Sequence, residues 1–352
     1  MKKYLYLTLA LLLPLLTLGQ QKEQLNVNVH PGIELFTIIQ QLAGKYPPAN
    51  PSKYSEEVDA WFGKYKEHPA VKKVASFDKT YTDLVELGWC MDGFPNIKIY
   101  EPTELSWYKY YGKESVLEYL RLCKDFFNDT HFWSFYQQHQ ARYQHWGDEL
   151  KAKVDSGKLI AKLQDFYRYR ADVRWYICID PLNSWGSHAI MTKTLNPKYS
   201  DWIVYNTGYF AKGATAATDP IFEFKDFENL VWHEGGHIYI QPLFEQYKTN
   251  INVLAYLYNK DDEGMKRNNI TSWNYCLNEN IVRGITAALY KKYRTERQFK
   301  KQLADETVRD FIYAEDICDL VYRQYLGTSR YKDFKAYFPV LLAELKKKHP
   351  TF

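Results

Sequence analysis

Two histidines and a glutamate in the stretch "VWHEGGHIYI" are the residue types of a metal-dependent hydrolase. His233 and His237 are four positions apart, so on a helix they lie one turn apart on the same face. Imidazole nitrogens bind zinc at about 2.0–2.1 Å, and two rings so placed can converge on one ion. Glu234 is rotated by about 100° from His233 and would lie beside the ion, where it can take a proton from a water that zinc activates. The spacing is the HExxH pattern of zinc metallopeptidases.

The alternative is that two of the nine histidines fall four residues apart by coincidence on an ordinary helix. Gly235 and Gly236, between the histidines, count against coincidence, because each glycine inside a helix costs about 1 kcal/mol relative to alanine. A close approach of another backbone, or of a substrate, would explain the pair. Residues 223–232 have helical apolar spacing, and Pro242 predicts where this helix ends.

A catalytic zinc needs a third protein ligand and one open position. The extended motif HExxHxxGxxH is absent, so this ligand must come from another segment. The stretch "SWNYCLNENIVRGITAALYKKY" predicts an apolar helix in which Glu279 and Arg283 are four residues apart. They could form a surface ion pair, but a glutamate in an apolar helix needs a metal or an arginine as partner. Glu279 is therefore the expected third ligand, with Glu245 and Cys276 as rivals.

Helical patterns flank a short group of strand patterns. Helices are expected within residues 32–44, 55–65, 69–87, 113–127 and 131–154, and after residue 220 nearly to the end. Strands are expected within residues 172–180, 187–194 and 201–210. Because the elements are segregated, the sequence predicts the α+β class, with one domain over residues 20–352. Its helical part is residues 20–170, and the sheet and active-site helices are residues 171–352.

The last expected strand, residues 201–210, is the candidate edge of the sheet. Zinc peptidases commonly bind an extended peptide along a sheet edge near the metal, where main-chain hydrogen bonds supply affinity. An interior position of this strand is the other interpretation.

The first residues have the features of a secretory signal. Lys2 and Lys3 precede the apolar run "YLYLTLALLLPLLTLG", which is too short to span a bilayer comfortably. Residues 1–19 are therefore excluded from the fold, and an exported protein, periplasmic or extracellular, is expected. No later segment is apolar enough to cross a membrane. A net charge of +4 is small for 352 residues and gives no support for a nucleic-acid partner.

Cysteines and aromatic residues leave several interpretations open. The five cysteines are widely spaced and match no zinc-ribbon pattern, so buried thiols with room for one disulfide are expected. The 31 Tyr, 19 Phe and 10 Trp could build a core or a surface that stacks on peptides or sugars. A glycan-active protein and a non-catalytic module that keeps a metal site are therefore alternatives to a peptidase. No phosphate-binding loop and no serine-hydrolase elbow is present.

Several stretches resemble an uncharacterised family of bacterial exported proteins regarded as zincin-type metalloproteases. These stretches are "NVHPGIELFTIIQQLAGKY", "VDAWFGKYKEHPAVKKV", "VWHEGGHIYIQPLFE" and "NENIVRGITAALY". The resemblance covers most of the mature chain and is specific at the HExxH stretch, at Pro242 and at the glutamate-to-arginine helix. The paired glycines depart from the bulkier residues of that family.

This resemblance implies a metalloprotease fold with a zinc site. It implies metal ligands at His233, His237 and Glu279, a general base at Glu234, and Arg283 as an active-site companion. The expected function is a zinc metallopeptidase that acts on peptides or proteins, with no nucleic-acid partner and no transmembrane anchor. Candidates for the group that stabilises the oxyanion are Arg283, Tyr275, Tyr205 and His188. Substrate and oligomeric state stay open.

Overall fold

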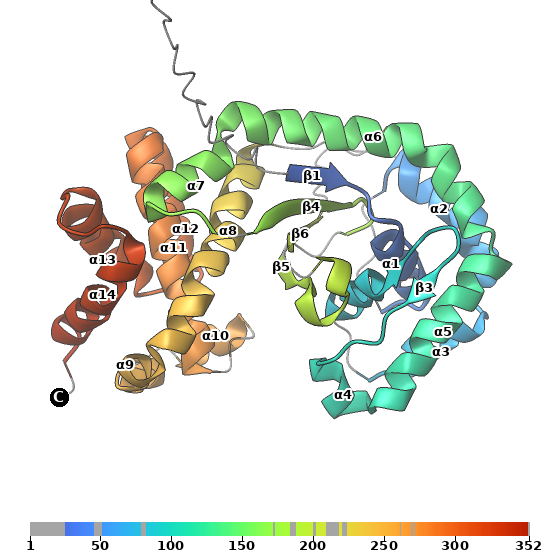
Figure 1. Ribbon diagram of the computed structural model, residues 1–352, viewed down its shortest axis with the longest axis horizontal. Helices are drawn as coiled ribbons and strands as arrows, with labels where there is room; N and C mark the ends of the chain where they lie inside the picture. Colours follow the sequence, from blue (N-terminus) through green and yellow to red (C-terminus); the bar gives the residue numbers. More distant parts are fainter. Residues whose placement is uncertain are drawn as a thin grey trace, which may run out of the picture.

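A small sheet lies between two groups of helices (Figure 1). The computed structural model describes residues 25–45, 51–78, 82–171, 173–183, 188–199, 202–208, 218–219, 224–260, 262–268, 270 and 272–350. The expected signal segment, residues 1–19, lies outside the described residues. The chain is mostly helical with a small sheet, so the predicted α+β class is confirmed.

The main sheet has the strand order β1-β4-β6-β5. Its strands are β1 (Leu25–Asn28), β4 (Arg174–Asp180), β5 (His188–Met191) and β6 (Trp202–Gly208). Strands β1, β4 and β6 are parallel, and β5 runs antiparallel to β6. The three expected strands are present. Strand β1 was not predicted, because four residues are too few to show a strand period. A separate ribbon pairs β2 (Met91–Asp92) with β3 (Lys98–Ile99).

The predicted edge position of β6 is wrong. Strand β6 is paired on both sides, with β4 and with β5. Within the described part of the chain, β5 is the outer strand on that side of the sheet. The error has a simple cause: β6 is the last strand before the motif helix in the sequence, but β5 precedes it in the sequence and lies outside it in space.

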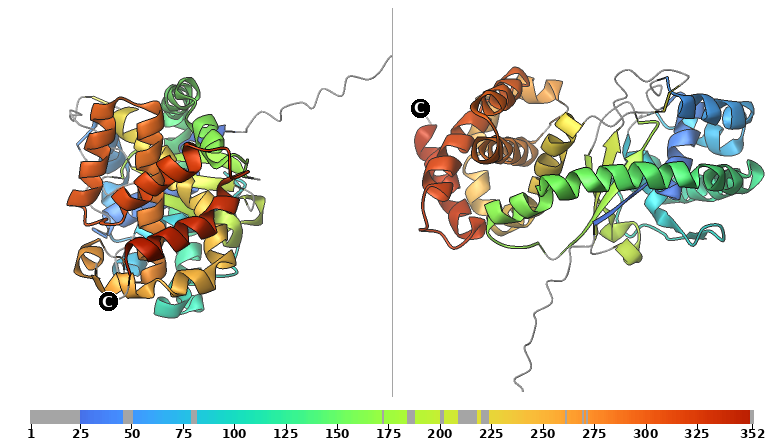
Figure 2. Two further views of the ribbon diagram at one scale, coloured as in Figure 1. Left: turned by 90° about the vertical axis from the view of Figure 1, so that its left-hand side faces the viewer. Right: turned by 90° about the horizontal axis from the view of Figure 1, so that it is seen from above.

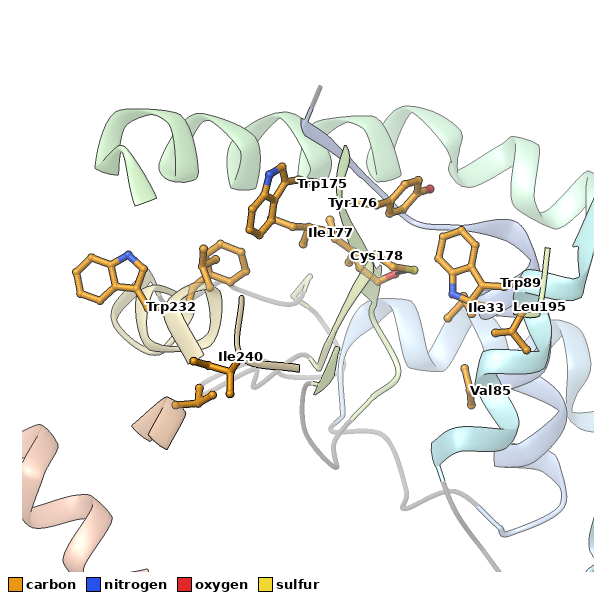
Figure 3. Close-up of a cluster of buried hydrophobic side chains, with 14 of the residues drawn as sticks. Ile33, Val85, Trp89, Trp175, Tyr176, Ile177, Cys178, Leu195, Trp232 and Ile240 are labelled. Carbon is orange, nitrogen blue, oxygen red and sulfur yellow. Dashed lines mark hydrogen bonds between the residues drawn. The ribbon is translucent and has the colours of Figure 1, made fainter. Parts of the chain in front are cut away.

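Strand β4 is the centre of the core and is buried on both faces. Figure 3 shows Trp175 and Ile177 pointing toward the motif helix, where Trp232 lies, and Tyr176 pointing to the opposite face. There the rings of Tyr176 and Trp89 are 5.0 Å apart between centroids. The strand therefore joins the two halves of the molecule, because each face of β4 packs against a different group of helices.

The N-terminal helices cover one side of the sheet, and α6 runs along the molecule past β1 (Figures 1 and 2). The helices on this side are α1 (Pro31–Leu42), α2 (Lys53–Phe62), α3 (Pro69–Ala75), α4 (Ser106–Tyr111) and α5 (Lys113–Asp129). Helix α6 (Phe132–Gly157) leads across the molecule to α7 (Leu159–Tyr167), which packs on α8 in the other group of helices (Figure 1). Gly147 permits the close approach of α6 to β1, because a Cβ there would lie 2.4 Å from the carbonyl oxygen of Val27.

The continuous helix expected over residues 69–87 is wrong. Helix α3 ends at Ala75, where Ser76 favours a helix end, and a 3-10 helix follows at Thr82–Cys90.

The C-terminal helices surround the motif. They are α8 (Phe224–Gln246), α9 (Lys248–Asn252), α10 (Asp262–Arg267), α11 (Trp273–Tyr293), α12 (Glu296–Val308), α13 (Ala314–Leu320), continued by a π-helical turn (Val321–Leu326), and α14 (Phe334–Lys348). Helix α8 contacts β5 and β6 on one side and α11 on another, and α11 also packs on α12 and α13. The motif helix therefore lies between the sheet and α11.

The predicted end of the motif helix at Pro242 is wrong, because α8 continues to Gln246. A proline inside a helix removes one backbone hydrogen bond. Here Leu243 and Phe244 are buried in the following turn, and the Phe244 ring lies 6.0 Å from that of Phe338 on α14. Burial of these side chains offsets the missing hydrogen bond.

All five cysteines are buried and free, which fits the expectation of small hydrophobic residues rather than a disulfide framework. None of the helices in the described ranges combines the length and the apolar character needed to cross a bilayer.

Candidate metal centre

The three predicted metal ligands converge between α8 and α11. The Nε2 atoms of His233 and His237 are 3.4 Å apart. The carboxylate of Glu279 places Oε2 at 3.5 Å from Nε2 of His233 and Oε1 at 3.2 Å from Nε2 of His237. One donor atom from each residue lies within 4.8 Å of the others, and no second cluster of this kind occurs among the described residues.

Gly236 explains why α8 and α11 lie so close together. A Cβ at Gly236 would lie 2.8 Å from Cγ1 of Val282 and 3.4 Å from the hydroxyl of Tyr167. A side chain there would require Val282 to shift, and Val282 lies one turn after Glu279 on α11. The sequence predicted a backbone or a substrate beside the glycine pair, and the neighbour is a side chain of α11.

The charges of the cluster follow from burial and from the neighbours of each group. Burial holds the pKa of His233 well below its ordinary value, and the charge of Arg283 lowers it further. Burial also opposes protonation of His237, but the hydrogen bond and the charge of Glu279 outweigh it and raise the pKa to about 9. For Glu279, burial favours the neutral acid, but the imidazoles and Arg283 outweigh it and lower the pKa. Without a metal, one proton is therefore held between His237 and an ionised Glu279.

A side chain that the sequence reasoning missed fixes the orientation of His237. Its Nδ1 lies 2.6 Å from Oδ1 of Asn278, and Nδ2 of Asn278 donates to Oε1 of Gln241 at 3.2 Å. An amide oxygen can only accept, so Nδ1 of His237 carries a proton and Nε2 is directed at the cluster. Asn278 directly precedes Glu279. One segment of α11 therefore supplies the carboxylate of the cluster and also the hydrogen-bond acceptor that orients His237.

Arg283 is held by two carboxylates rather than facing an open space. Its Nε and Nη2 donate to Oε2 of Glu279 at 3.1 and 3.0 Å, and its Nη1 donates to Oε2 of Glu306 at 2.7 Å. The guanidinium carbon also lies 3.8 Å from the ring centroid of Phe311. These contacts fix the position of the carboxylate of Glu279 through Arg283.

The support of Arg283 extends to a third helix. Glu306 on α12 is buried and accepts from Nε2 of Gln302 at 2.5 Å, and Gln302 accepts from Nδ2 of Asn229 on α8 at 2.5 Å. This chain of hydrogen bonds returns to α8 one turn before His233. Sequence reasoning missed Glu306 because no local pattern identifies a partner 23 residues beyond Arg283.

Glu234 lies beside the donors without belonging to them. Its Oε1 is 3.9 Å from Nε2 of His233, and its side chain is mostly buried. This position is beside the cluster, where Glu234 could accept a proton without being a ligand.

The rival ligands do not belong to the cluster. Glu245 is exposed on the last turns of α8, and Cys276 is a buried thiol on α11. Tyr275, one oxyanion candidate, is half exposed at the start of α11. The side chains of His188 and Tyr205, two further oxyanion candidates, lie outside the described part of the structure.

A comparison with protein families matches residues 97–344 to a "Domain of unknown function (DUF4932)". The chain belongs to this family. The DUF4932 match includes α8, α11 and α12, so every residue of the candidate metal centre lies inside it. No curated protein and no solved structure matches the chain.

Proposed function

We propose that this chain is an exported zinc-dependent metallopeptidase with a zincin-type fold. The observation that carries the proposal is the convergence of Nε2 of His233, Nε2 of His237 and the carboxylate of Glu279. Four ligands placed tetrahedrally at about 2.0–2.1 Å from a zinc ion are separated from one another by about 3.3–3.4 Å. The separation of 3.4 Å between the two Nε2 atoms agrees with that spacing, and each Nε2 lies 3.2–3.5 Å from one oxygen of Glu279, Oε2 for His233 and Oε1 for His237. A fourth position, open to water or substrate, would complete the site.

The chemical character of the donors also fits zinc. Two imidazoles and one carboxylate are the ligand set of many catalytic zinc sites. Glu279 is ionised, and a divalent cation would take the place of the proton held by His237. Asn278 supports His237, and Arg283 supports Glu279, as the outer partners of metal ligands commonly do.

The catalytic step assigned to this chain is proton transfer by Glu234. Zinc, when bound, supplies Lewis acidity to a water and to the substrate carbonyl. Glu234 takes a proton from the water as it attacks the peptide carbonyl carbon, and passes it to the leaving amine when the C–N bond breaks. Its Oε1 lies 3.9 Å from Nε2 of His233, so the carboxylate is beside one of the three proposed ligands.

Strand β5 is the surface we assign to the peptide backbone. It is the outer strand beside β6, and it contacts α8, which carries the two histidines. A peptide that adds to this edge would form main-chain hydrogen bonds and lie next to the donors. The binding edge expected from the sequence thus moves from β6 to β5.

The test is the substitution Glu234→Gln, compared with wild type on a diverse peptide library. Glutamine keeps the shape of glutamate but accepts no proton from water, so hydrolysis should fall by about 10²–10⁴-fold. Zinc content and melting temperature should stay the same, since Glu234 is not a ligand. A wild-type protein that binds zinc but cleaves no peptide would favour the non-catalytic binding module. An active Glu234→Gln protein would assign the base to another carboxylate.

A further inference from the structure

The proton on Nδ1 of His237 fixes the orientation of two side-chain amides. Nδ1 donates to Oδ1 of Asn278 at 2.6 Å, so the Nδ2 group is the end of this amide that reaches Gln241. There it donates to Oε1 at 3.2 Å. The oxygen of the Gln241 amide is therefore turned toward Asn278, and its Nε2 group, which carries two N–H donors, is the opposite end.

Gln241 is exposed and follows His237 by one turn on the same face of α8. In the described part of the chain, its Nε2 donates to no protein group. An exposed glutamine ordinarily keeps its rotamer freedom, but the hydrogen bond from Asn278 restrains this one. The result is an oriented donor that faces solvent close to the metal centre.

Helices α8 and α11 are antiparallel. The proposed ligands Glu279 on α11 and His237 on α8 are in contact. Further along α11, the ring of Tyr290 lies 5.3 Å from that of Trp232, which precedes His237 on α8. Moving from the metal centre toward the C-terminal end of α8 therefore means moving toward the N-terminal end of α11. On α11, one turn in that direction from Glu279 leads to Tyr275.

Tyr275 thus lies at the same end of the centre as Gln241. It precedes Asn278 by three residues and Glu279 by four, so the three share one face of α11. That face meets α8, because Asn278 contacts Gln241 and Glu279 contacts His237. Tyr275 is 50% exposed. An aromatic side chain and an oriented amide donor therefore border the same end of the metal centre.

These two groups match the two parts of a peptide residue. The carbonyl oxygen of an extended peptide is an acceptor for the amide donor, and an apolar side chain can cover a half-exposed ring. Tyrosine commonly provides such contacts, because a rigid ring binds with little loss of conformational freedom. A peptide with an apolar or aromatic side chain near the scissile bond fits both groups.

We propose that Gln241 and Tyr275 form a substrate subsite beside the metal centre, and this inference rests on the proposed peptidase function. Nε2 of Gln241 donates to a main-chain carbonyl oxygen of the peptide. The ring of Tyr275 packs on an apolar or aromatic side chain of the same peptide residue or of its neighbour. Gln241 is thus a substrate-positioning residue, and Tyr275 determines specificity.

The experiment measures peptide binding to the zinc-loaded chain carrying Glu234→Gln, so that binding is read without hydrolysis. The probes are two series of dye-labelled hexapeptides. In the first series, one phenylalanine is moved through the positions of a peptide of alanine and serine. In the second, each backbone amide in turn is replaced by an ester, whose carbonyl is a weaker acceptor than that of an amide.

Phenylalanine at one position should tighten binding by about 5- to 10-fold, the range of an aromatic pair. Tyr275→Ala should reduce this preference to within about 2-fold, and Tyr275→Phe should keep it because the ring remains. Tyr110→Ala is the matched control, since Tyr110 is 52% exposed and lies on α4 in the other group of helices.

An ester at the carbonyl that Gln241 binds should weaken binding by about 5-fold, the effect of one hydrogen bond. In Gln241→Met this penalty should fall to within about 2-fold. Esters that disturb pairing with β5 weaken binding to both proteins alike, so the difference isolates Gln241. Gln241→Glu keeps an oxygen for Asn278 but has no donor, and it should lose the penalty too. The control is Gln246→Met, at the exposed end of α8.

An ester penalty that survives in Gln241→Met, or a phenylalanine preference that survives in Tyr275→Ala, overturns the inference, as does the absence of either effect in the parent chain. Hydrolysis by the chain with Glu234 intact is measured in parallel. If both effects depend on these residues but no peptide is cleaved, the peptidase function fails while the subsite stands. If peptides are cleaved and neither substitution changes the preferences, the function stands and the inference fails.

Discussion

Glu34 on α1 and Glu279 on α11 are both buried, but their surroundings move their pKa values in opposite directions. Glu34 accepts a 2.5 Å hydrogen bond from the hydroxyl of Tyr54, and the negative charge of another acid, Asp180, opposes its ionisation. Burial, with Asp180 adding to it, raises the pKa of Glu34 to about 8. Around Glu279, imidazoles and Arg283 outweigh burial and lower the pKa.

The difference separates a structural acid from a candidate metal ligand. Near neutral pH, Glu34 holds its proton and serves the hydrogen bonding of the N-terminal core, where the hydroxyls of Tyr54 and Tyr143 are 2.6 Å apart. Glu279 is an ionised carboxylate with two imidazole nitrogens beside it, which is what a divalent cation requires. Burial of a glutamate therefore points to no metal site by itself, and it is the convergence of two imidazoles on Glu279 that makes the second glutamate a candidate ligand.

The largest effect is expected from matched glutamine substitutions at the two glutamates. Glu279→Gln replaces a charged ligand by a weak one. Zinc affinity should therefore fall by more than about 100-fold, which exceeds the loss seen when a residue that only supports a metal ligand is replaced. Glu34→Gln should leave zinc affinity unchanged. Competition with a fluorescent chelator measures both. Equal affinities for Glu279→Gln and wild type would remove Glu279 from the ligand set.

Removing the positive charge of Arg283 would leave Glu279 a buried acid without its arginine partner, as Glu34 is. Arg283→Met leaves Glu279 and Glu306 buried without their partner, and the free energy of unfolding of the metal-free protein should fall by about 3 kcal/mol. Zinc should restore part of this loss. Urea unfolding with a chelator present measures the effect, and exposed Arg297→Met, expected to change stability by less than about 0.5 kcal/mol, is the control. An unchanged urea midpoint for Arg283→Met would show that Arg283 does not compensate the buried charges of Glu279 and Glu306.

Asn278 provides a smaller test of the same centre. Asn278→Ala removes the acceptor of Nδ1 of His237, so the imidazole is less well oriented. Zinc affinity should fall by about 10-fold, the lower end of the range for an outer partner of a metal ligand. The overall fold should be kept, as circular dichroism can check. No change in zinc affinity would mean that His237 is oriented by its packing alone.

Glu34 gives the smallest effect, in the pH dependence of stability. Its folded pKa of about 8 lies above the unfolded value of 4.5, so the folded state binds more protons between these values and stability falls as pH rises through the window. Glu34→Gln resembles the protonated acid and removes this contribution. The stability of wild type relative to the variant should fall by about 1 kcal/mol between pH 6 and pH 7. A constant difference across this window contradicts the assigned protonation state.

Local spacing was sufficient to predict the parts of the site that lie within one helix. The four-residue spacing of His233 and His237 implies a common face, and an acid in the apolar helix of Glu279 implies a partner. The strands around residues 174–180 and 202–208 were likewise visible as local periodicity. The α+β class followed from the order of these segments.

What the sequence could not provide depends on contacts between distant elements. The order of β5 and β6 in the sheet, the continuation of α8 through Pro242, and the contact of Gly236 with Val282 are set by packing. The link from Arg283 to Glu306 crosses from α11 to α12, and no spacing rule reports it. Asn278 was within reach of sequence reasoning, because an amide next to a ligand is a common support.

The most direct test of the metal centre is the zinc stoichiometry of the purified chain. Elemental analysis after dialysis against trace zinc should find one zinc per wild-type chain and one per Glu34→Gln chain. The double substitution His233→Ala and His237→Ala should leave less than about 0.1 zinc per chain, because two of three protein ligands are lost. Undiminished zinc in the double variant, or none in the wild type, would contradict the assignment of the centre to His233, His237 and Glu279.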